Sequence, residues 1–88
     1  MSTYMVGYDL NKRGQDYDAL IEAIKTYHWW HCLDSTWIIK TSDTPLQIRD
    51  RLQQYVDSND GLLVIEVNRN AAWVGFSEEC SDWLQANL

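Results

Sequence analysis

Basic residues are scarce in this sequence. Its 88 residues include seven Lys or Arg against 13 Asp or Glu, which gives a net charge of −6. General nucleic-acid binders display basic patches, because much of their affinity comes from neutralising phosphates. The surface of this chain should on average repel phosphate, so we expect any nucleic-acid role to be local or assisted by a metal ion.

Long apolar runs are also missing. No run approaches the roughly 20 residues that a membrane-spanning helix requires. Residues 1–10 lack the basic start and apolar block of a signal peptide. We therefore expect a cytoplasmic protein without a membrane partner. The two cysteines, Cys32 and Cys80, form no CxxC pair. Because a cytoplasmic setting argues against a disulfide, we expect both to be small buried hydrophobic residues.

The motifs of several common enzyme classes are absent. The chain contains no P-loop, no GxGxxG and no Ser-His-Asp arrangement. Internal repeats, linkers and low-complexity segments are missing too, so residues 1–88 are expected to form one domain. Hydrophobic residues make up 45% of the chain and include five Trp and five Tyr, a composition far from that of disordered proteins. The chain should fold.

Hydrophobic patterns predict the element order βαββαβ, followed by a short fifth strand and a last helix. β-Branched and aromatic residues bounded by turn residues indicate the strands, and a three-to-four-residue apolar spacing indicates the helices. The expected strands cover residues 3–9, 28–33, 35–41, 62–67 and 71–76. The expected helices cover residues 16–27, 42–56 and 77–88. Thr44 and Ser77 are expected as N-caps, and Gln47 closes a capping box with Thr44.

This order predicts an α+β protein with the ferredoxin-like fold, a βαββαβ sandwich with two helices on one face of an antiparallel sheet. The strands are apolar on both faces. In strand 62–67, Leu62 and Val64 point one way while Leu63 and Ile65 point the other. Because two helices cover only one face, we expect a second copy to cover the other in an isologous homodimer. The alternative is a monomer whose last helix covers that face.

An acidic residue ends the first predicted strand, in YMVGYDLNKRG at 4–14. In a dimer packed sheet to sheet, Asp9 can face its symmetry mate, and two close carboxylates then need a cation or a shared proton. Hard oxygen ligands favour magnesium or manganese, whose bound water can attack a phosphodiester. On this hypothesis Asp9 is the metal ligand and catalytic residue, and Lys12 and Arg13 contact phosphate. The alternative is that Asp9 caps backbone N–H groups of the following loop.

Three short stretches, taken together, resemble one known family. YMVGYDLNKRG is an apolar run ending in Tyr-Asp, DSTWIIKT at 34–41 carries Ser35 and Trp37, and NDGLLVIEV at 59–67 carries Asp60. These resemble the Tyr-Asp strand, the Ser-Val-Phe-Glu strand and the Asp-Ser-x-Arg-Ile-Tyr strand of the Cas-two family of small CRISPR-associated adaptation subunits. The chain is also similar to orphan bacterial proteins labelled SinR-family, and VapD-type toxin ribonucleases belong to the same superfamily.

The resemblance implies the ferredoxin-like fold, a homodimer and a divalent metal at Asp9 on the dimer interface. Members are described as RNase, as DNase and as a non-catalytic scaffold for spacer integration. The chain departs from the family at two positions, where Leu63 replaces an Arg and Ile38 replaces a Glu. A dimer would carry twice −6, or −12, which fits a scaffold on duplex DNA poorly. We therefore expect an orphan Cas-two-like relative rather than an active adaptation subunit.

Two functions follow as expectations. The first is a weak endonuclease dependent on Mg or Mn and acting on RNA or DNA, with Asp9 as ligand. Lys12 and Arg13 would contact phosphate, and Ser35 would give the nucleic acid polar support. The second is a non-catalytic dimeric scaffold that binds a protein partner in a defence, toxin or mobile-element system, with a structural Asp9.

Two other candidate sites are weaker. His28 and His31 lie three apart on a predicted strand, so they should face opposite sides of the sheet and not share a metal. Tyr4 and Tyr8 share a strand face, as the base-stacking aromatics of RNA-recognition motifs do, but the glycine-aromatic motif of that family is absent. We expect these aromatic residues to serve the core or an interface.

Overall fold

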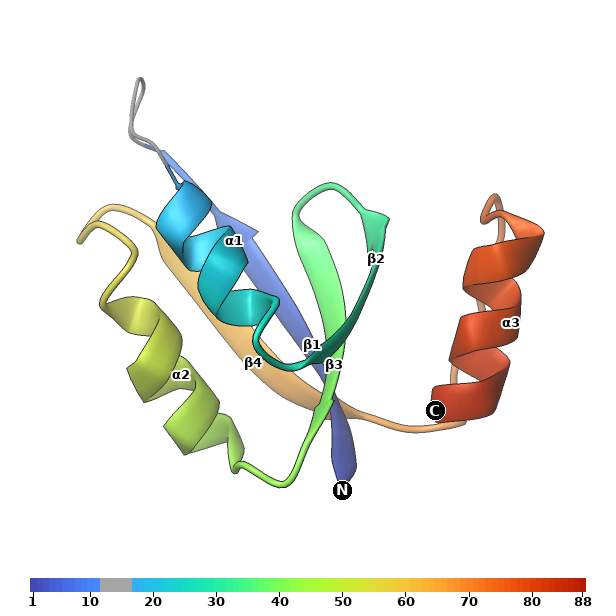
Figure 1. Ribbon diagram of the computed structural model, residues 1–88. Helices are drawn as coiled ribbons and strands as arrows, with labels where there is room; N and C mark the ends of the chain where they lie inside the picture. The colour runs from blue at the N-terminus through green and yellow to red at the C-terminus, as the bar shows by residue number, and fades with distance from the viewer. Residues whose placement is uncertain (12–16) are drawn as a thin grey trace.

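A computed structural model of the chain describes residues 1–11 and 17–88. In this part of the chain, four strands and three helices follow in the order β1, α1, β2, β3, α2, β4, α3 (Figure 1). The strands are β1 (Ser2–Asp9), β2 (His28–Leu33), β3 (Thr36–Thr41) and β4 (Gly61–Val67). The helices are α1 (Asp18–Ile24), α2 (Pro45–Gln53) and α3 (Glu78–Asn87). The expected α+β class is confirmed.

The strands form one antiparallel sheet in the order β2-β3-β1-β4. The central strand β1 pairs with β3 on one side and with β4 on the other, so that Val6 lies opposite both Trp37 and Val64. β2 and β4 are therefore the edges. The predicted bounds of the four strands agree with the observed ones within a residue, because alternating β-branched and aromatic residues are a local signal.

The core lies between one face of the sheet and the helices α1 and α2, which lie on the same side of it (Figure 1). The sheet contributes the buried residues Tyr4, Val6, Trp37 and Ile39. The helices contribute Leu20 and Ile24 from α1, and Ile48 and Leu52 from α2. Each aliphatic side chain that is fully removed from water contributes about 1.5–3 kcal/mol of transfer free energy. This burial fixes how the ends of the strands are placed.

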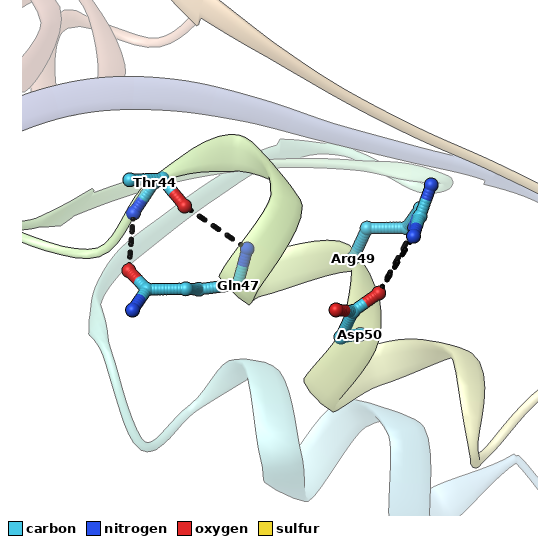
Figure 2. A network of polar contacts seen from close by, with 4 residues as sticks. All are labelled: Thr44, Gln47, Arg49 and Asp50. Atoms are coloured by element: carbon cyan, nitrogen blue, oxygen red, sulfur yellow. Dashed lines mark hydrogen bonds and ion pairs between the residues drawn. The ribbon is translucent and has the colours of Figure 1, made fainter.

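The start of α2 follows the expected capping pattern. The Thr44 hydroxyl accepts a hydrogen bond from the Gln47 backbone N–H at 3.1 Å, and the Gln47 side chain accepts one from the Thr44 N–H at 2.8 Å (Figure 2). Pro45 occupies the first helical position, where its missing N–H costs nothing. Farther along the helix, Arg49 pairs with Asp50 at 2.8 Å (Figure 2). That pair is exposed and contributes little to stability.

Both predicted crossover helices are shorter than expected. α1 spans Asp18–Ile24 instead of 16–27, and its expected start at Asp16 lies outside the described residues. After α1, the N–H groups of Thr26 and Tyr27 bond to carbonyls three residues back, which tightens the chain into a turn before β2. α2 ends at Gln53 in the same way, with Tyr55 and Val56 in the following turn. Their apolar side chains still pack against the core.

The face of the sheet opposite α1 and α2, called the second face below, is partly covered by α3. The hydroxyl of Thr3 in β1 donates to the backbone carbonyl of Asn87 near the end of α3 at 2.8 Å. α3 stands apart from the other two helices, beyond β2 (Figure 1). On the opposite edge, Leu63 and Ile65 of β4 remain 54% and 47% exposed. The cover that α3 gives to the second face is therefore incomplete.

The expectation that both cysteines are free is wrong, because Cys32 and Cys80 form a disulfide. Cys32 lies in β2 and Cys80 in the first turn of α3, and their Cα atoms are 6.2 Å apart, within the range that a disulfide spans. The prediction relied on the expected compartment. The tertiary fold, which brings α3 against β2, is not visible in the spacing of the two residues.

The expected fifth strand at 71–76 is also wrong. These residues are irregular, and Gly75 has a φ of +83°, which is outside the strand region. The segment leaves the end of β4 and crosses to α3, so it has no strand beside it with which to share a hydrogen-bond ladder. The indole N–H of Trp73 donates instead to the Ser81 hydroxyl of α3 at 3.0 Å. The apolar residues of this segment pack against the second face of the sheet and do not add a strand to it.

The last helix is confirmed with its N-cap, since the Ser77 hydroxyl accepts a hydrogen bond from the Cys80 N–H at 3.1 Å. Glu78 and Glu79 occupy its first turn, where negative charge is favourable. In the ranges 1–11 and 17–88, no helix has the length and apolar character needed to cross a membrane.

Candidate functional site

Three loops meet at one end of the sheet, here called the Asp9 end. Because β1 is antiparallel to both neighbours, its last residue lies beside the β2–β3 turn and the start of β4. The backbone N–H of Tyr8 donates to the Ser35 carbonyl in that turn at 3.1 Å. Asp9 itself is paired with Gly61 of β4. The fold thus brings Asp9 and Ser35, two of the predicted site residues, to the same end.

The Asp9 side chain is exposed and belongs to the second face. It follows Met5 and Gly7 in the alternation of β1, whereas Tyr4 and Val6 point into the core. Across the strand pair, Gly61 has no side chain, and a Cβ placed there would lie 3.8 Å from the Asp9 Cβ. Within the described residues, the Asp9 carboxylate has no hydrogen-bond or ion-pair partner, and the nearby Asn11 side chain donates to the Asp9 carbonyl at 3.5 Å. The carboxylate is open to solvent.

The remaining predicted site residues are less well placed. Ser35 is exposed in the turn that connects β2 and β3, and its recorded hydrogen bond uses its backbone carbonyl. Among the described residues, none of the contacts that hold this turn uses the Ser35 hydroxyl. The hydroxyl is therefore available at the Asp9 end. Lys12 and Arg13 lie outside the described residues.

Asp60, the residue that matches the family aspartate, fixes the start of β4 at the Asp9 end. Its carboxylate accepts hydrogen bonds from the Asn11 N–H at 2.7 Å and from the Asp57 N–H at 2.7 Å. It also accepts one from the Tyr17 hydroxyl at 2.9 Å, which ties in the residue just before α1. Asn11 reaches the same turn again through its side chain, which donates to the Asn59 carbonyl at 2.9 Å. Asp60 thus ties the chain just after Asp9 to the turn that precedes β4.

A second polar cluster at the Asp9 end lies on the core side of the sheet and was not predicted. The Trp37 indole N–H donates to the Tyr8 hydroxyl at 3.0 Å, and that hydroxyl donates to the Asp34 carbonyl at 3.3 Å. The His31 ring stacks on Trp37 with ring centroids 3.7 Å apart, and its Nε2 lies 3.0 Å from the Asp34 carbonyl oxygen. These contacts hold the β2–β3 turn against the end of β1.

The sequence contains only an indirect signal for this cluster. Tyr8 and Trp37 occupy core-side positions of their strands, but their contact depends on the register between β1 and β3, which local patterns do not define. The prediction that the two histidines face opposite sides is confirmed. His31 stacks on Trp37 on the core side, whereas His28 lies edge-on to Trp83 of α3 at 5.8 Å on the second face.

The donor atoms of one chain fit a divalent cation only in part. In the part of the chain that the structure describes, no group of three His, Cys, Asp or Glu side chains is placed to hold a metal ion. Magnesium is commonly held by one or two carboxylates together with waters and substrate phosphates. The exposed Asp9 carboxylate is a suitable hard oxygen donor for such an ion.

A perturbed titratable group lies away from the Asp9 end. Burial raises the pKa of the Tyr27 hydroxyl above its ordinary value of 10.0; the nearby Asp43 carboxylate adds to the rise and Arg51 opposes it. The hydroxyl donates to Asp43 Oδ2 at 3.3 Å, and the Arg51 guanidinium lies over the Tyr27 ring at 5.2 Å. Because Tyr27 precedes β2 and Asp43 follows β3, this cluster is at the opposite end of the sheet.

No protein-family model matches the chain, and no solved structure matches it at a significant level. The resemblance to the Cas-two family therefore depends on the three sequence stretches alone, and its consequences are proposals.

Proposed function

We propose that the protein is an orphan Cas-two-like homodimer with the ferredoxin-like fold, and that it is a weak Mg- or Mn-dependent endonuclease acting on RNA or DNA. The element order of β1 to β4 and the strand order β2-β3-β1-β4 support this fold. α3 is an addition to it. Since its substrates would be encountered in the cytoplasm, the proposal includes the cytoplasmic location expected from the sequence.

The observation that carries the proposal is the position of Asp9 beside exposed apolar side chains. Leu63 and Ile65 are paired with Gly7 and Met5 and lie on the second face with Asp9. Both are about half exposed, which is unfavourable for two neighbouring aliphatic side chains in a monomer. Leu63 and Ile65 are called the apolar strip below. A two-fold pairing of two copies through this strip would bury both side chains and bring the two Asp9 carboxylates toward each other.

The chemistry then follows from the two carboxylates. Two like charges held close together favour a shared cation, because their repulsion otherwise raises the free energy of the interface. A divalent ion bound there would supply a water of lowered pKa as the nucleophile and would neutralise charge on the phosphate. Asp9 of each copy orients the ion, and the exposed Ser35 hydroxyl at the same end donates to a phosphate oxygen. Lys12 and Arg13, which follow Asp9 closely in the sequence, supply further phosphate contacts.

A non-catalytic scaffold is the second candidate, and the charge of the chain favours it. A dimer with twice −6, or −12, binds an extended nucleic acid poorly, since few phosphates can be neutralised. In this case the strip of Leu63 and Ile65 serves assembly, Asp9 is structural, and the partner is a protein of a defence, toxin or mobile-element system.

The test is a cleavage assay on metal-free protein of measured solution mass. Labelled RNA and DNA are incubated with and without Mn²⁺ or Mg²⁺, for the wild type, Asp9→Asn and Asp34→Asn. Asp34 is a matched control because its side chain is exposed at the same end and the change in charge is identical. We expect metal-dependent cleavage that Asp9→Asn lowers by more than about 100-fold, beyond the effect typical of residues that only support a ligand. Asp34→Asn should retain wild-type activity.

Two results would contradict the proposal in different ways. A monomer mass at micromolar concentration removes the dimer and with it the paired carboxylates. A dimer that is inert with every metal, or equally active in both variants, excludes the nuclease and leaves the scaffold.

A further inference from the structure

α3 is attached to the second face at its two ends and through Trp83, whose ring stacks on Trp30 and lies edge-on to His28. In its first turn, Cys80 is covalently bonded to Cys32 of β2. In its middle, the Trp83 ring stacks on Trp30 of β2 with centroids 5.9 Å apart. At its end, the Asn87 carbonyl accepts the Thr3 hydrogen bond. The disulfide is the covalent member of this set.

The chain segment that precedes α3 contacts the helix through two side-chain hydrogen bonds, from the Trp73 indole N–H to the Ser81 hydroxyl at 3.0 Å and from Arg69 Nε to the Leu88 carbonyl at 2.9 Å. Residues 68–77 lack regular secondary structure, and Val74 within them is 92% exposed. The backbone hydrogen bond recorded inside the segment runs from the Ala71 N–H to the Arg69 carbonyl at 2.8 Å. The segment therefore joins β4 to α3 through an irregular backbone and a few side-chain contacts.

Packing between α3 and the sheet is incomplete. A half-open cavity of about 230 Å³ lies between the second face and the C-terminal segment. Its walls include the apolar residues Met5, Ile38, Trp73, Phe76 and Leu84. Protein interiors normally leave few spaces larger than a water molecule, and the atoms lining a void lose dispersion contacts. The noncovalent attachment of α3 is therefore weaker than the attachment of α1 and α2 to the core.

The disulfide is within reach of a reductant. Cys32 and Cys80 are both half-buried, because β2 is an edge strand and the first turn of α3 is at the surface. The Trp30 indole N–H donates to Cys80 Sγ at 3.1 Å. This contact places a hydrogen-bond donor at the sulfur that would carry negative charge when the bond is broken, and so favours Cys80 as the leaving thiolate.

We propose that the Cys32–Cys80 disulfide is a redox latch whose reduction releases α3 from the second face. A thiolate of a dithiol reductant attacks Cys32 Sγ, forming a mixed disulfide and releasing Cys80 as a thiolate that takes up a proton. The second thiol of the reductant then attacks the mixed disulfide and frees Cys32. Two electrons and two protons pass to the protein, and the reductant becomes a disulfide. Release exposes Met5 and Ile38 next to the apolar strip of β4.

The latch goes beyond the proposed function and does not depend on it. It concerns which surface of the sheet is open in each redox state, whether or not a second copy or a nucleic acid binds there.

Hydrogen exchange of backbone amides, read by mass spectrometry, tests the latch. The oxidised protein is compared with the same protein in excess dithiothreitol, and mass analysis with a thiol-alkylating reagent counts the free thiols. We expect exchange in residues 78–87 to accelerate by at least about tenfold on reduction, while exchange in β1 and β3 stays unchanged. A Cys32→Ser/Cys80→Ser variant should show the fast exchange without reductant and no response to it.

Each other outcome overturns the latch. If both thiols are alkylated and α3 keeps its protection, the noncovalent contacts are sufficient and the disulfide controls nothing. If protection is lost in β1 and β3 as well, the bond supports the whole fold rather than one helix. If the air-oxidised protein contains two free thiols, the bond does not form.

Discussion

At the scale of single residues, the polar side chains of this protein act mostly on backbone. Asp60 accepts two backbone N–H groups and fixes the chain beside Asp9. The Asp9 carboxylate, by contrast, is free of such bonds in the described residues. A carboxylate that holds backbone in place is restrained by its own hydrogen bonds, whereas an open one remains available to a cation.

Tyr27 predicts a loss of stability in alkaline solution. Because burial raises its pKa above the ordinary value of 10.0, the folded state holds the hydroxyl proton more tightly than the unfolded state. The stability this gives is fully present below pH 10.0 and is lost as the pH rises through the folded-state pKa. Urea unfolding between about pH 9 and about pH 11 should therefore show a falling free energy of unfolding.

The matched variant is Tyr27→Phe, which keeps the ring under Arg51 and removes the titrating group. Its free energy of unfolding should fall less steeply over the same range. At neutral pH it should lose about 0.5–1.5 kcal/mol for the bond to Asp43. An identical alkaline slope in both proteins would show that Tyr27 does not cause it.

Side-chain orientations that depend on the local sequence could be predicted, and contacts that depend on the register between strands could not. The opposite orientations of His28 and His31 follow from strand alternation alone. The cluster of Tyr8, Trp37 and His31 needs β1 and β3 to be aligned so that Gly7 lies opposite Thr36. A shift of one residue would turn each side chain to the other face, and no local pattern excludes that shift.

At the scale of elements, α2 shows how far a local code extends. Thr44, Pro45 and Gln47 mark the helix start in the sequence, and the structure has the reciprocal hydrogen bonds that this pattern predicts. The segment 71–76 has an apolar composition that resembles a strand. A strand also needs a neighbouring strand to pair with, and an apolar composition does not provide one. In the structure these residues line a cavity at the second face.

Removal of the α2 cap should measurably destabilise the protein. Thr44→Ala deletes the oxygen that accepts the Gln47 N–H and should lower the free energy of unfolding by about 1 kcal/mol. Thr44→Ser keeps that oxygen and should stay within about 0.5 kcal/mol of the wild type. Urea denaturation followed by circular dichroism measures both. Equal loss in the two variants would indicate that the threonine methyl group, not the cap, is responsible.

At the scale of the whole molecule, the two edges of the sheet differ in how they are protected. The β2 edge carries α3 and the disulfide, whereas the β4 edge exposes Leu63 and Ile65. The apolar alternation of β4 predicted a second face that needs cover. It did not predict that α3 covers one side of that face and leaves the other open, because the path of 68–77 and the pairing of Cys32 with Cys80 are tertiary properties.

If the open strip is the dimer interface, a charge placed there should separate the two copies. Ile65→Lys introduces an ammonium group into the buried strip and should convert a dimer to a monomer at micromolar concentration, as measured by light scattering. Val74→Lys is the control, because Val74 is 92% exposed and lies outside the strip. Val74→Lys should remain a dimer, and both variants should keep the wild-type circular dichroism spectrum. A dimer that persists in Ile65→Lys places the interface elsewhere.

The disulfide also changes how the chain can be extended. While the bond is closed, residues 32–80 form a covalent ring that contains β3, α2 and β4, and β1 lies between two strands of that ring without belonging to it. A force applied to the two termini passes through the bond, so the ring bears no load and only residues 1–31 and 81–88 can lengthen. Reduction opens the ring, so residues 32–80 can then also be extended by force. The redox state therefore determines the maximum length to which the chain can be stretched.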